Sequence, residues 1–206
     1  MPHAYATLMF TPAVLACQAR SGSAHEMQRY RDDNPGHDRL GPAEAAFIAR
    51  RDSFYQACVS ETGWPYVQHR GGPEGFLKVL DDRTLAYADY RGNRQYLSAG
   101  SLAVDDRVAL FLVDYRARRR LKILGRARQT DVADADPALV ARLRPYPYRA
   151  AMERIVVIAV EAWDWNCPQH LTPRWSEREV LEQVAPLRAR IAELEAELAA
   201  LRGAPT

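Results

Sequence analysis

Long apolar runs and a charge excess of one sign are both missing from this sequence of 206 residues. A membrane-spanning helix needs about 20 apolar residues. The longest apolar runs, residues 108–113 and 155–160, are far shorter. The 28 Lys and Arg residues nearly balance 26 Asp and Glu residues, and the net charge of +2 is too small to steer the chain toward nucleic acid or an anionic membrane. We therefore expect neither a membrane nor a nucleic acid as a partner.

Cysteine is scarce, and its three positions exclude two kinds of scaffold. Cys17, Cys58 and Cys167 lie far apart and form no CxxC pair, which argues against a disulfide framework and against a structural zinc site. This usage fits a reducing compartment, so we expect a cytoplasmic protein. Residues 14–16 resemble the apolar end of a lipoprotein signal, but no Lys or Arg precedes them. We therefore interpret Cys17 as an ordinary buried cysteine.

Closely spaced histidines are missing as well. None of the five His residues forms an HxH or an i,i+4 pair, and three of them, His3, His25 and His37, stand in the N-terminal region. We therefore predict no metal site. No Ser-His-Asp or Cys-His order can be assigned either, so the catalytic residues stay unknown at this stage.

Short segments of strand composition are what the chain has in abundance. Apolar residues make up 48% of the sequence and charged residues 26%, which is enough for one soluble globular core. The segments are separated by Gly, Pro and Asp turns and cover residues 54–60, 65–70, 75–80, 84–89, 108–115, 120–128 and 154–163. This pattern predicts an antiparallel barrel or sandwich of six to seven strands. Both faces of the last strand are apolar, so we expect it to be central.

Helices are predicted before, within and after this β region. Pro12 and Pro42 stand at first-turn positions of two N-terminal helices. A helix within residues 93–103 is inserted between the fourth and fifth strands, and another covers residues 137–143. The predicted organisation is an N-terminal helical extension (1–52), a β-barrel domain (53–165), and an irregular segment with a helical tail (166–206).

The helical tail carries a short heptad seam. Ser176 and Glu179 form a capping box at its start. Apolar residues then recur at spacings of three and four: Val184, Leu187, Ile191, Leu194, Leu198 and Leu201. A helix that lies on its own barrel and a helix that pairs with a second chain explain this seam about equally well.

Three clusters of cations and amides lie at strand ends: residues 67–72, 87–95 and 118–120. The planar guanidinium of Arg binds phosphate through two parallel hydrogen bonds. Arg94 stands just before the inserted helix, whose N-terminal amides and dipole would add to its charge. We therefore predict an anion site near Arg94, although each cluster taken alone is better explained as a solvated strand end.

Four stretches of the β region stand in a specific order: residues 54–61, 65–72, 85–95 and 119–127. In that order they resemble the FMN-binding split β-barrel of the pyridoxamine 5′-phosphate oxidase superfamily, in particular its oxidase-like proteins of unassigned substrate. Residues 65–70 take the place of the family's Arg-Met-Val-Leu-Leu-Lys strand, and Gly92 to Gln95 that of its Gly-Ser-Arg-Lys. The resemblance covers about half of the chain. The segment 166–170 is also typical of the unassigned group.

The resemblance implies an FMN cofactor and a set of residues that hold it. Along the ring and ribityl chain these are Val67, Gln68, His69, Arg70, Tyr87 and Ala88; at the phosphate, Asn93, Arg94 and Gln95; and further along the chain, Arg119 and Arg120, the latter near the isoalloxazine. FMN lies between two subunits in this family, which implies a homodimer. Trp165, Asn166 and Gln169 would then come from the partner chain.

The implied activity is that of an FMN-dependent oxidoreductase, in which a hydride moves to or from flavin N5 on an unassigned small molecule, with NADH or NADPH as a candidate reductant. Pro65 and Gln95 replace an Arg and a Lys of the family, and its C-terminal Arg-x-His ending is absent. We therefore do not expect pyridoxamine phosphate oxidase activity itself. The competing interpretation is a protein that binds a flavin, a deazaflavin or haem without turnover, with His69 as a candidate haem ligand.

Overall fold

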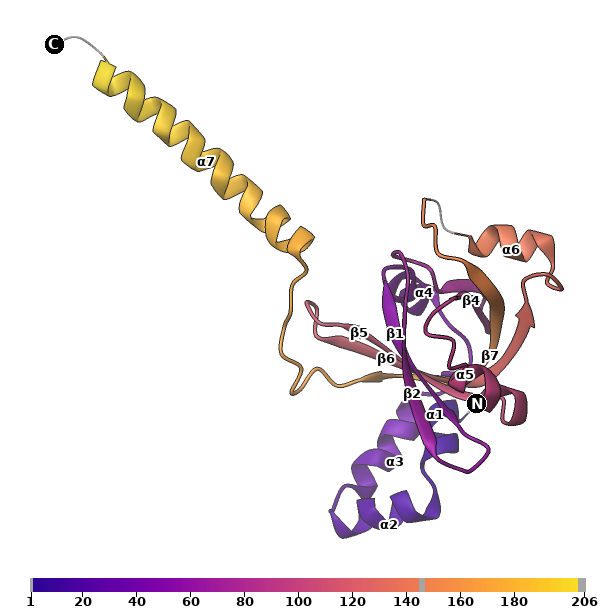
Figure 1. Cartoon of the computed structure of the whole chain (residues 1–206). Helices are drawn as coiled ribbons and strands as arrows, with labels where there is room; N and C mark the ends of the chain where they lie inside the picture. The colour runs from indigo at the N-terminus through magenta and orange to yellow at the C-terminus, as the bar shows by residue number, and fades with distance from the viewer. Residues whose placement is uncertain (1, 145–146, 204–206) are drawn as a thin grey trace. The chain divides into compact units, whose positions relative to one another are not determined.

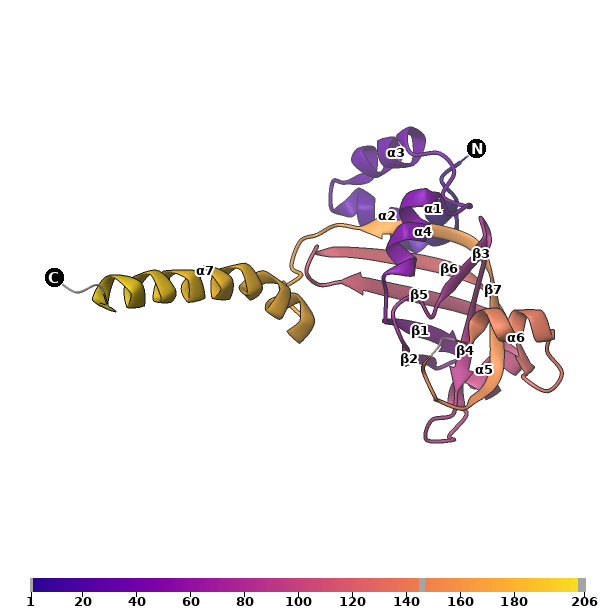
Figure 2. The same cartoon turned by 90° about the horizontal axis from the view of Figure 1, so that it is seen from above.

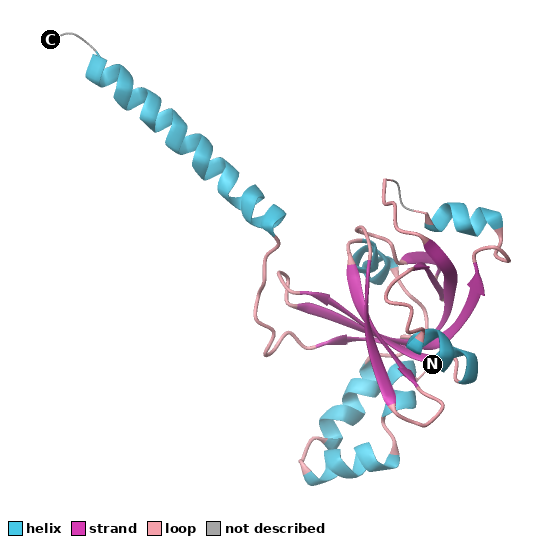
Figure 3. Cartoon of the chain, viewed as in Figure 1, coloured by secondary structure: helices cyan, strands magenta, loops and turns pink. Residues whose placement is uncertain are grey.

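The computed structural model describes residues 2–144 and 147–203 (Figures 1 and 3). It divides into two compact units: residues 1–114 with 119–168, and residues 115–118 with 169–206. The helices described are α1 (Ala4–Met9), α2 (Pro12–Arg20), α3 (Ala24–Asp33), α4 (Pro42–Ala49), α5 (Leu97–Val104), α6 (Pro137–Leu143) and α7 (Glu177–Gly203). The strands are β1 (Ser53–Val59), β2 (Pro65–Gly71), β3 (Lys78–Asp81), β4 (Thr84–Tyr90), β5 (Arg107–Asp114), β6 (Arg119–Asp131) and β7 (Met152–Asn166). The three predicted segments, 1–52, 53–165 and 166–206, stay predictions.

The strands form one antiparallel sheet in the order β2-β1-β5-β6-β7-β4-β3 (Figure 2). No ladder joins β2 to β3 in the described part of the chain, so the sheet is open. The register between β6 and β7 shifts at Leu124 and Gly125, and a Cβ on Gly125 would lie 2.5 Å from the carbonyl oxygen of Ala159. Such a bulge increases local bend and twist. The predicted mainly β fold of six to seven antiparallel strands, with flanking helices and a C-terminal helix, is confirmed.

Strand β7 is central, as its two apolar faces predict. It pairs with β6 along one side and with β4 along the other. Ile155 and Ile158 are both fully buried, yet they belong to two different core clusters. The strand is also longer than predicted, because Trp165 and Asn166 continue the ladder opposite Leu121 and Arg120. It therefore reaches from one end of the sheet to the other.

Two other elements begin later than predicted, and turns explain both differences. Strand β3 begins at Lys78 rather than at Gly75, whose φ of +74° belongs to a turn. Helix α5 begins at Leu97, since the backbones of Arg94 and Tyr96 are left-handed, with φ of +64° and +53°. Few side chains other than Gly, Asn and Asp adopt that conformation readily, and a helix cannot continue through it.

The N-terminal helices follow their start signals, but one expectation about them is wrong. Pro12 and Pro42 open α2 and α4, and Thr11 caps α2 by accepting a hydrogen bond from the amide of Val14. Cys17 is exposed rather than buried, because no residue of α2 is buried. The apolar run before Cys17 therefore reflects an exposed helix.

A buried network joins the N-terminus to the sheet. The ring of His3 is 1% exposed and shares a hydrogen bond of 2.8 Å with the hydroxyl of Tyr30. That hydroxyl donates to one oxygen of Asp164, and Lys122 donates to the other at 2.7 Å. The ring of His37 stacks on His3 with centroids 4.1 Å apart. The network holds residues that are more than 100 positions apart in the sequence.

Helix α7 dominates the second unit. Its predicted capping box is confirmed, since the Ser176 hydroxyl accepts from the backbone amide of Glu179 and the backbone amide of Ser176 donates to the Glu179 carboxylate. In the same unit, the guanidinium of Arg116 lies 5.0 Å from the ring centroid of Trp175 and 3.5 Å from Glu179. No helix in residues 2–144 and 147–203 combines the length and the apolar character needed to cross a bilayer.

Candidate functional site

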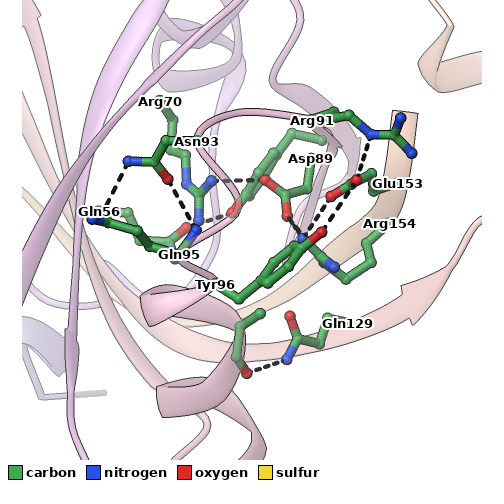
Figure 4. A network of polar contacts seen from close by, with 12 residues as sticks. Gln56, Arg70, Asp89, Arg91, Asn93, Gln95, Tyr96, Gln129, Glu153 and Arg154 are labelled. Atoms are coloured by element: carbon green, nitrogen blue, oxygen red, sulfur yellow. Dashed lines mark hydrogen bonds and ion pairs between the residues drawn. The ribbon is translucent and has the colours of Figure 1, made fainter. Parts of the chain in front are cut away.

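A cavity of about 290 Å³ lies where β2, β4, the loop after β4, the start of α5 and the start of β7 meet (Figure 4). Its lining includes side chains of both charges and several aromatic rings: Tyr66, Gln68, Arg70, Tyr87, Asp89, Asn93, Arg94, Gln95, Tyr96, Ser98, Glu153 and Arg154. These residues come from three stretches of the sequence, 66–70, 87–98 and 153–154. The sheet order brings β4 and β7 together, and α5 follows directly from β4.

Asp89 is the central acid of this cavity and is only 7% exposed. One of its carboxylate oxygens accepts from Arg70 Nη1 at 2.7 Å, and the other accepts from Arg154 Nη2 at 2.8 Å and Nε at 3.1 Å (Figure 4). A buried carboxylate is stable as an anion only when its oxygens are satisfied in this way. Asp89 therefore fixes two guanidinium groups from two different strands on one side of the cavity.

A second carboxylate extends the network toward solvent. Glu153 accepts from Arg91 Nε at 2.8 Å and lies 3.4 Å from Arg154 Nη2. The hydrogen bond from Arg91 holds the pKa of Glu153 below its ordinary value, so this carboxyl is ionised at neutral pH. The guanidinium of Arg154 also lies 5.0 Å from the ring centroid of Tyr96. Arg154 is thus held by two acids and one aromatic ring.

The loop between β4 and α5 is pre-shaped by its own hydrogen bonds. The side-chain oxygen of Asn93 accepts from the amide of Gln95 at 3.1 Å, which closes an Asx turn. Arg94 follows in a left-handed conformation with an exposed side chain, and within the described residues it has no ion-pair partner. The hydroxyl of Ser98, in the first turn of α5, is buried without a hydrogen-bond partner. A cation, a hydroxyl and a helix N-terminus thus border the same cavity.

The inner wall of the cavity is formed by Tyr87. Its ring is 1% exposed, and its hydroxyl donates to Gln56 Oε1 at 2.7 Å. Burial raises the pKa of this phenol, so the hydroxyl remains protonated. The side-chain nitrogen of Gln56 and Nε of Arg70 are buried without a partner. Buried donors without a partner are rare. Of these two residues only Arg70 lines the cavity, so only its Nε lies where a ligand could accept a hydrogen bond.

The charges of the cavity favour an anion. Arg70, Arg94 and Arg154 outnumber Asp89 and Glu153 by one positive charge. The N-terminus of α5 adds a partial positive charge and amides that have no partner within the helix. We therefore describe the cavity as an anion site with one aromatic wall.

The structure brings together most of the residues that the sequence assigns to a cofactor. Those that line the cavity are Gln68, His69, Arg70, Tyr87, Ala88, Asn93, Arg94 and Gln95. The side chain of Val67 lies on the other face of the sheet, where it borders a separate depression with Tyr55 and Phe111. His69 is exposed, and its ring packs edge-on against Tyr55 across the ladder. This arrangement follows from the alternation of side chains along β2.

A second group of predicted site residues lies far from the cavity within one chain. Arg120 pairs with Asn166 across β6 and β7, and its guanidinium donates to the carbonyl of Cys167. Arg119 lies 4.1 Å from the ring centroid of Trp165. Asn166 and Arg154 are twelve residues apart on β7. At about 3.3 Å per residue, that separation approaches 40 Å.

Within one chain, therefore, the small molecule that contacts Arg70 cannot also contact Arg119, Arg120, Trp165 or Asn166. The fifth residue of this predicted group, Gln169, belongs to the second unit. For Arg120, which the resemblance places near the isoalloxazine, one chain does not supply the expected contact.

Sequence reasoning did not select Asp89, Ser98, Glu153 or Arg154 as site residues. A signal for Asp89 exists, because it is the one charged residue in the otherwise apolar and aromatic segment 85–90. Arg154 gives no such signal. It joins the site only because β7 pairs with β4 and places it directly opposite Asp89.

The sequence predicts no metal site, but two histidines and an aspartate lie close together outside the cavity. Ligand atoms of His3, His37 and Asp164 all lie within 4.8 Å of one another. Tyr30 and Lys122 already donate to the two oxygens of Asp164. His3 and Asp164 therefore belong to a hydrogen-bond network, whereas His37 stacks on His3 and its Nδ1 is buried without a hydrogen-bond partner.

Comparison with known families gives one match. Residues 40–167 match the family model described as pyridoxamine 5′-phosphate oxidase. The matched segment contains the cavity and all seven strands described above. A comparison with curated protein sequences gives no match.

Among solved structures, HupZ from Group A Streptococcus is similar in fold, with a TM-score of 0.50 and 13% identity over 66% of this chain and 100% of that chain. A putative pyridoxamine 5′-phosphate oxidase from Lactobacillus delbrueckii has a TM-score of 0.48 and 20% identity over 63% of this chain and 97% of that chain. An FMN-binding protein from Syntrophomonas wolfei has a TM-score of 0.45 and 9% identity over 73% of this chain and 97% of that chain. At these identities the similarity concerns the fold alone.

Proposed function

Because the chain belongs to the pyridoxamine 5′-phosphate oxidase family, we propose that it is an FMN-dependent oxidoreductase whose cavity at Asp89 binds the phosphate end of the cofactor. The observation that carries this proposal is the convergence of Arg70, Arg94 and Arg154 with the N-terminus of α5. Helix N-termini and Arg side chains are the groups that proteins use most often for phosphate. The proposed substrate remains a small molecule of unassigned structure.

The residues present fit such a cofactor. The buried hydroxyl of Ser98 and Nε of Arg70 belong to cavity-lining residues and are donors without partners, and FMN is rich in acceptor oxygens. In the proposed complex, Arg94, Ser98 and the amides of α5 bind the phosphate. Asp89 holds Arg70 and Arg154 in place for the same anion.

The chemistry of the reaction is supplied by FMN, which transfers a hydride at N5 when it is bound. The protein's part is to bind and orient it. Tyr66 and Gln68 line the cavity beside Arg70 and offer an aromatic face and an amide to the ring system. Because the cofactor supplies the chemistry, the protein needs no nucleophile and base of its own. This agrees with the absence of a Ser-His-Asp or Cys-His order in the sequence.

The size of the cavity favours a dimeric site. Its volume of about 290 Å³ is at the lower limit of ligand pockets, which hold about 300–1,000 Å³. The cavity therefore suits the phosphate and ribityl part, and the ring would extend beyond it. We propose that a second copy of the chain covers the ring, with Trp165, Asn166 and Gln169 as its contributions.

The first experiment is an absorption spectrum of the purified chain, followed by titration of FMN into the apoprotein. Two flavin bands and quenched flavin fluorescence are expected, and addition of NADH or NADPH should bleach the bands. A Soret band instead of flavin bands would support haem, and tighter binding of a deazaflavin than of FMN would change the cofactor. A colourless protein that ignores all three would overturn the proposal.

Ser98→Ala tests the phosphate site without a strong effect on the fold. The variant removes a buried hydroxyl that has no partner, so the free energy of unfolding should stay constant or rise slightly. The affinity for FMN should fall by about 5- to 10-fold, as for one lost hydrogen bond. Ser101→Ala is the matched control, because its hydroxyl already donates to the carbonyl of Leu97 and does not line the cavity.

A further inference from the structure

Helix α7 presents an unpaired apolar seam along much of its length. Leu187, Ile191, Leu194 and Leu198 are between 41% and 64% exposed, and they follow one another at spacings of four, three and four residues. An α-helix places such residues on one face. Single exposed leucines are common, but a continuous row of this kind indicates a surface that another helix covers.

The residue types along this seam favour a specific arrangement. The spacings place Val184, Ile191 and Leu198 at heptad position a, and Val180, Leu187 and Leu194 at position d. β-Branched residues at a combined with Leu at d favour parallel two-stranded coiled coils. From Leu187 to the end of the helix, the a position Ile191 is β-branched and the d positions Leu187 and Leu194 are leucine, whereas the a position Leu198 is not β-branched.

The charges beside the seam agree with that arrangement. In a parallel pair in register, a residue at position g faces the residue five positions later, at position e, of the other helix. Arg190 at g would therefore face Glu195, and Glu197 at g would face Arg202. Both pairs are of opposite sign, and each occurs twice in a two-fold dimer.

We propose that α7 pairs with α7 of a second copy of this chain as a parallel, in-register two-stranded coiled coil that begins at Leu187. Pro186 sets this start, because it lacks the amide that would donate to the carbonyl of Glu182. It lies at position c, so its ring faces away from the seam. The inference is independent of the flavin assignment.

The seam after Pro186 covers about two heptads, fewer than the three to four of an autonomous coiled coil. The pairing therefore depends on the effective concentration of one helix near the other. Contacts elsewhere in the chain that bring two copies together would raise this concentration. For this reason the test uses the full chain and reads the helix contact directly by disulfide crosslinking.

Leu194→Cys places a thiol at a d position, where it meets its own counterpart only in a parallel pair in register. The exposed Cys17 and Cys167 are first replaced by Ser, while the buried Cys58 is kept. Under mild oxidation, most Leu194→Cys chains should migrate as a covalent dimer. The control Ala196→Cys, at the outer f position of the same helix, should remain mostly monomeric.

Charge exchange in the Leu194→Cys background tests the register. Arg190→Glu and Glu195→Arg should each lower the yield of crosslinked dimer, and the two together should restore it. Glu193→Arg is the matched control. Glu193 is exposed, pairs with Arg190 at 2.9 Å within its own helix and lies at position c, so the yield should not change.

Three outcomes would overturn the proposal. The first is equal crosslinking of Ala196→Cys and Leu194→Cys. The second is crosslinking between Ile191→Cys and Leu194→Cys chains without Leu194→Cys homodimers, which would indicate an antiparallel pair. The third is a double charge exchange that does not restore the yield.

Discussion

Arg154 lies directly opposite Asp89 in the ladder between β4 and β7, and its guanidinium contacts the carboxylate at 2.8 Å. The pair joins the start of the longest strand to the end of β4, where the loop toward α5 begins. It therefore connects the sheet to the helix terminus that we assign to phosphate.

Asp89→Asn should destabilise the fold, because the neutral amide removes the carboxylate that pairs with the partly buried guanidinium of Arg70 and leaves Arg154 only its 3.4 Å contact with Glu153. Loss of one partner of a buried ion pair lowers the free energy of unfolding by about 3 kcal/mol. Urea unfolding measures this change. Asp82→Asn is the matched control: its pair with Arg39 is about half exposed on both sides, so water screens it and its loss should change stability much less. Equal effects of the two variants would contradict the central role of Asp89.

Arg94→Ala should leave the fold intact and weaken FMN binding. The side chain is exposed, and alanine keeps the Cβ, so the left-handed backbone is strained to the same degree. Loss of a charge-assisted contact to phosphate corresponds to about 30- to 150-fold in dissociation constant. Fluorescence titration of the apoprotein measures the change.

Arg91→Ala is the control for Arg94, since Arg91 pairs with Glu153 at the rim and does not line the cavity. Its effect on FMN affinity should be small. If Arg91→Ala weakens binding more than Arg94→Ala, the phosphate lies on the outer side of the loop.

Stability should fall as the pH drops below the ordinary pKa of histidine. Burial lowers the pKa of His3 below 6.5; the electrostatic effects of His37 and Lys122 act in the same direction, and that of Asp164 opposes them. The unfolded chain therefore binds the proton more readily, so this contribution to stability is complete above pH 6.5 and is lost as the pH falls through the folded-state pKa. His3→Gln should flatten the fall in Tm between about pH 7.5 and pH 5. The exposed His25→Gln should keep the wild-type slope.

Gly125→Ala should destabilise the sheet, whereas Gly100→Ala should not. At Gly125 the added Cβ would lie 2.5 Å from the backbone oxygen of Ala159, so two strands must separate. Overpacking of this kind lowers the free energy of unfolding by about 1–3 kcal/mol. At Gly100, inside α5, no atom lies within 4 Å of the added Cβ, and alanine favours the helix by about 1 kcal/mol. Thermal unfolding of both variants compares the two sites.

The elements of the fold were predictable because composition and turns are local properties. The apolar faces of β7, the prolines that open α2 and α4, and the capping box of α7 all act within a few residues. The position of Arg94 at a cavity beside the start of α5 was predictable for the same reason, since Gly92 and the helix after it are neighbours in the chain. Pairing between distant strands was not predictable, so Arg154 was missed.

The family resemblance predicted which residues belong to the cofactor site, but not whether they lie near one another in one chain. Motif order placed Arg119 and Arg120 with the same cofactor as Arg70. The lengths of β6 and β7 place them at the other end of the sheet, and only a second chain could bring such residues to the cavity. A sequence motif shows which residues are present, whereas strand length and register determine which of them lie close together in the structure.

The open sheet has two edge strands, and both are poor templates for a further strand. Strand β3 has only four residues, and its ladder with β4 is irregular between Val79 and Asp81. Strand β2 starts with Pro65, which offers no amide hydrogen, and carries the cationic Arg70 near its end. Edges of this kind resist β-augmentation and edge-to-edge aggregation. The two dimer contacts that we propose accordingly use side chains around the cofactor and along α7 and leave the backbone amides of the sheet edges unused.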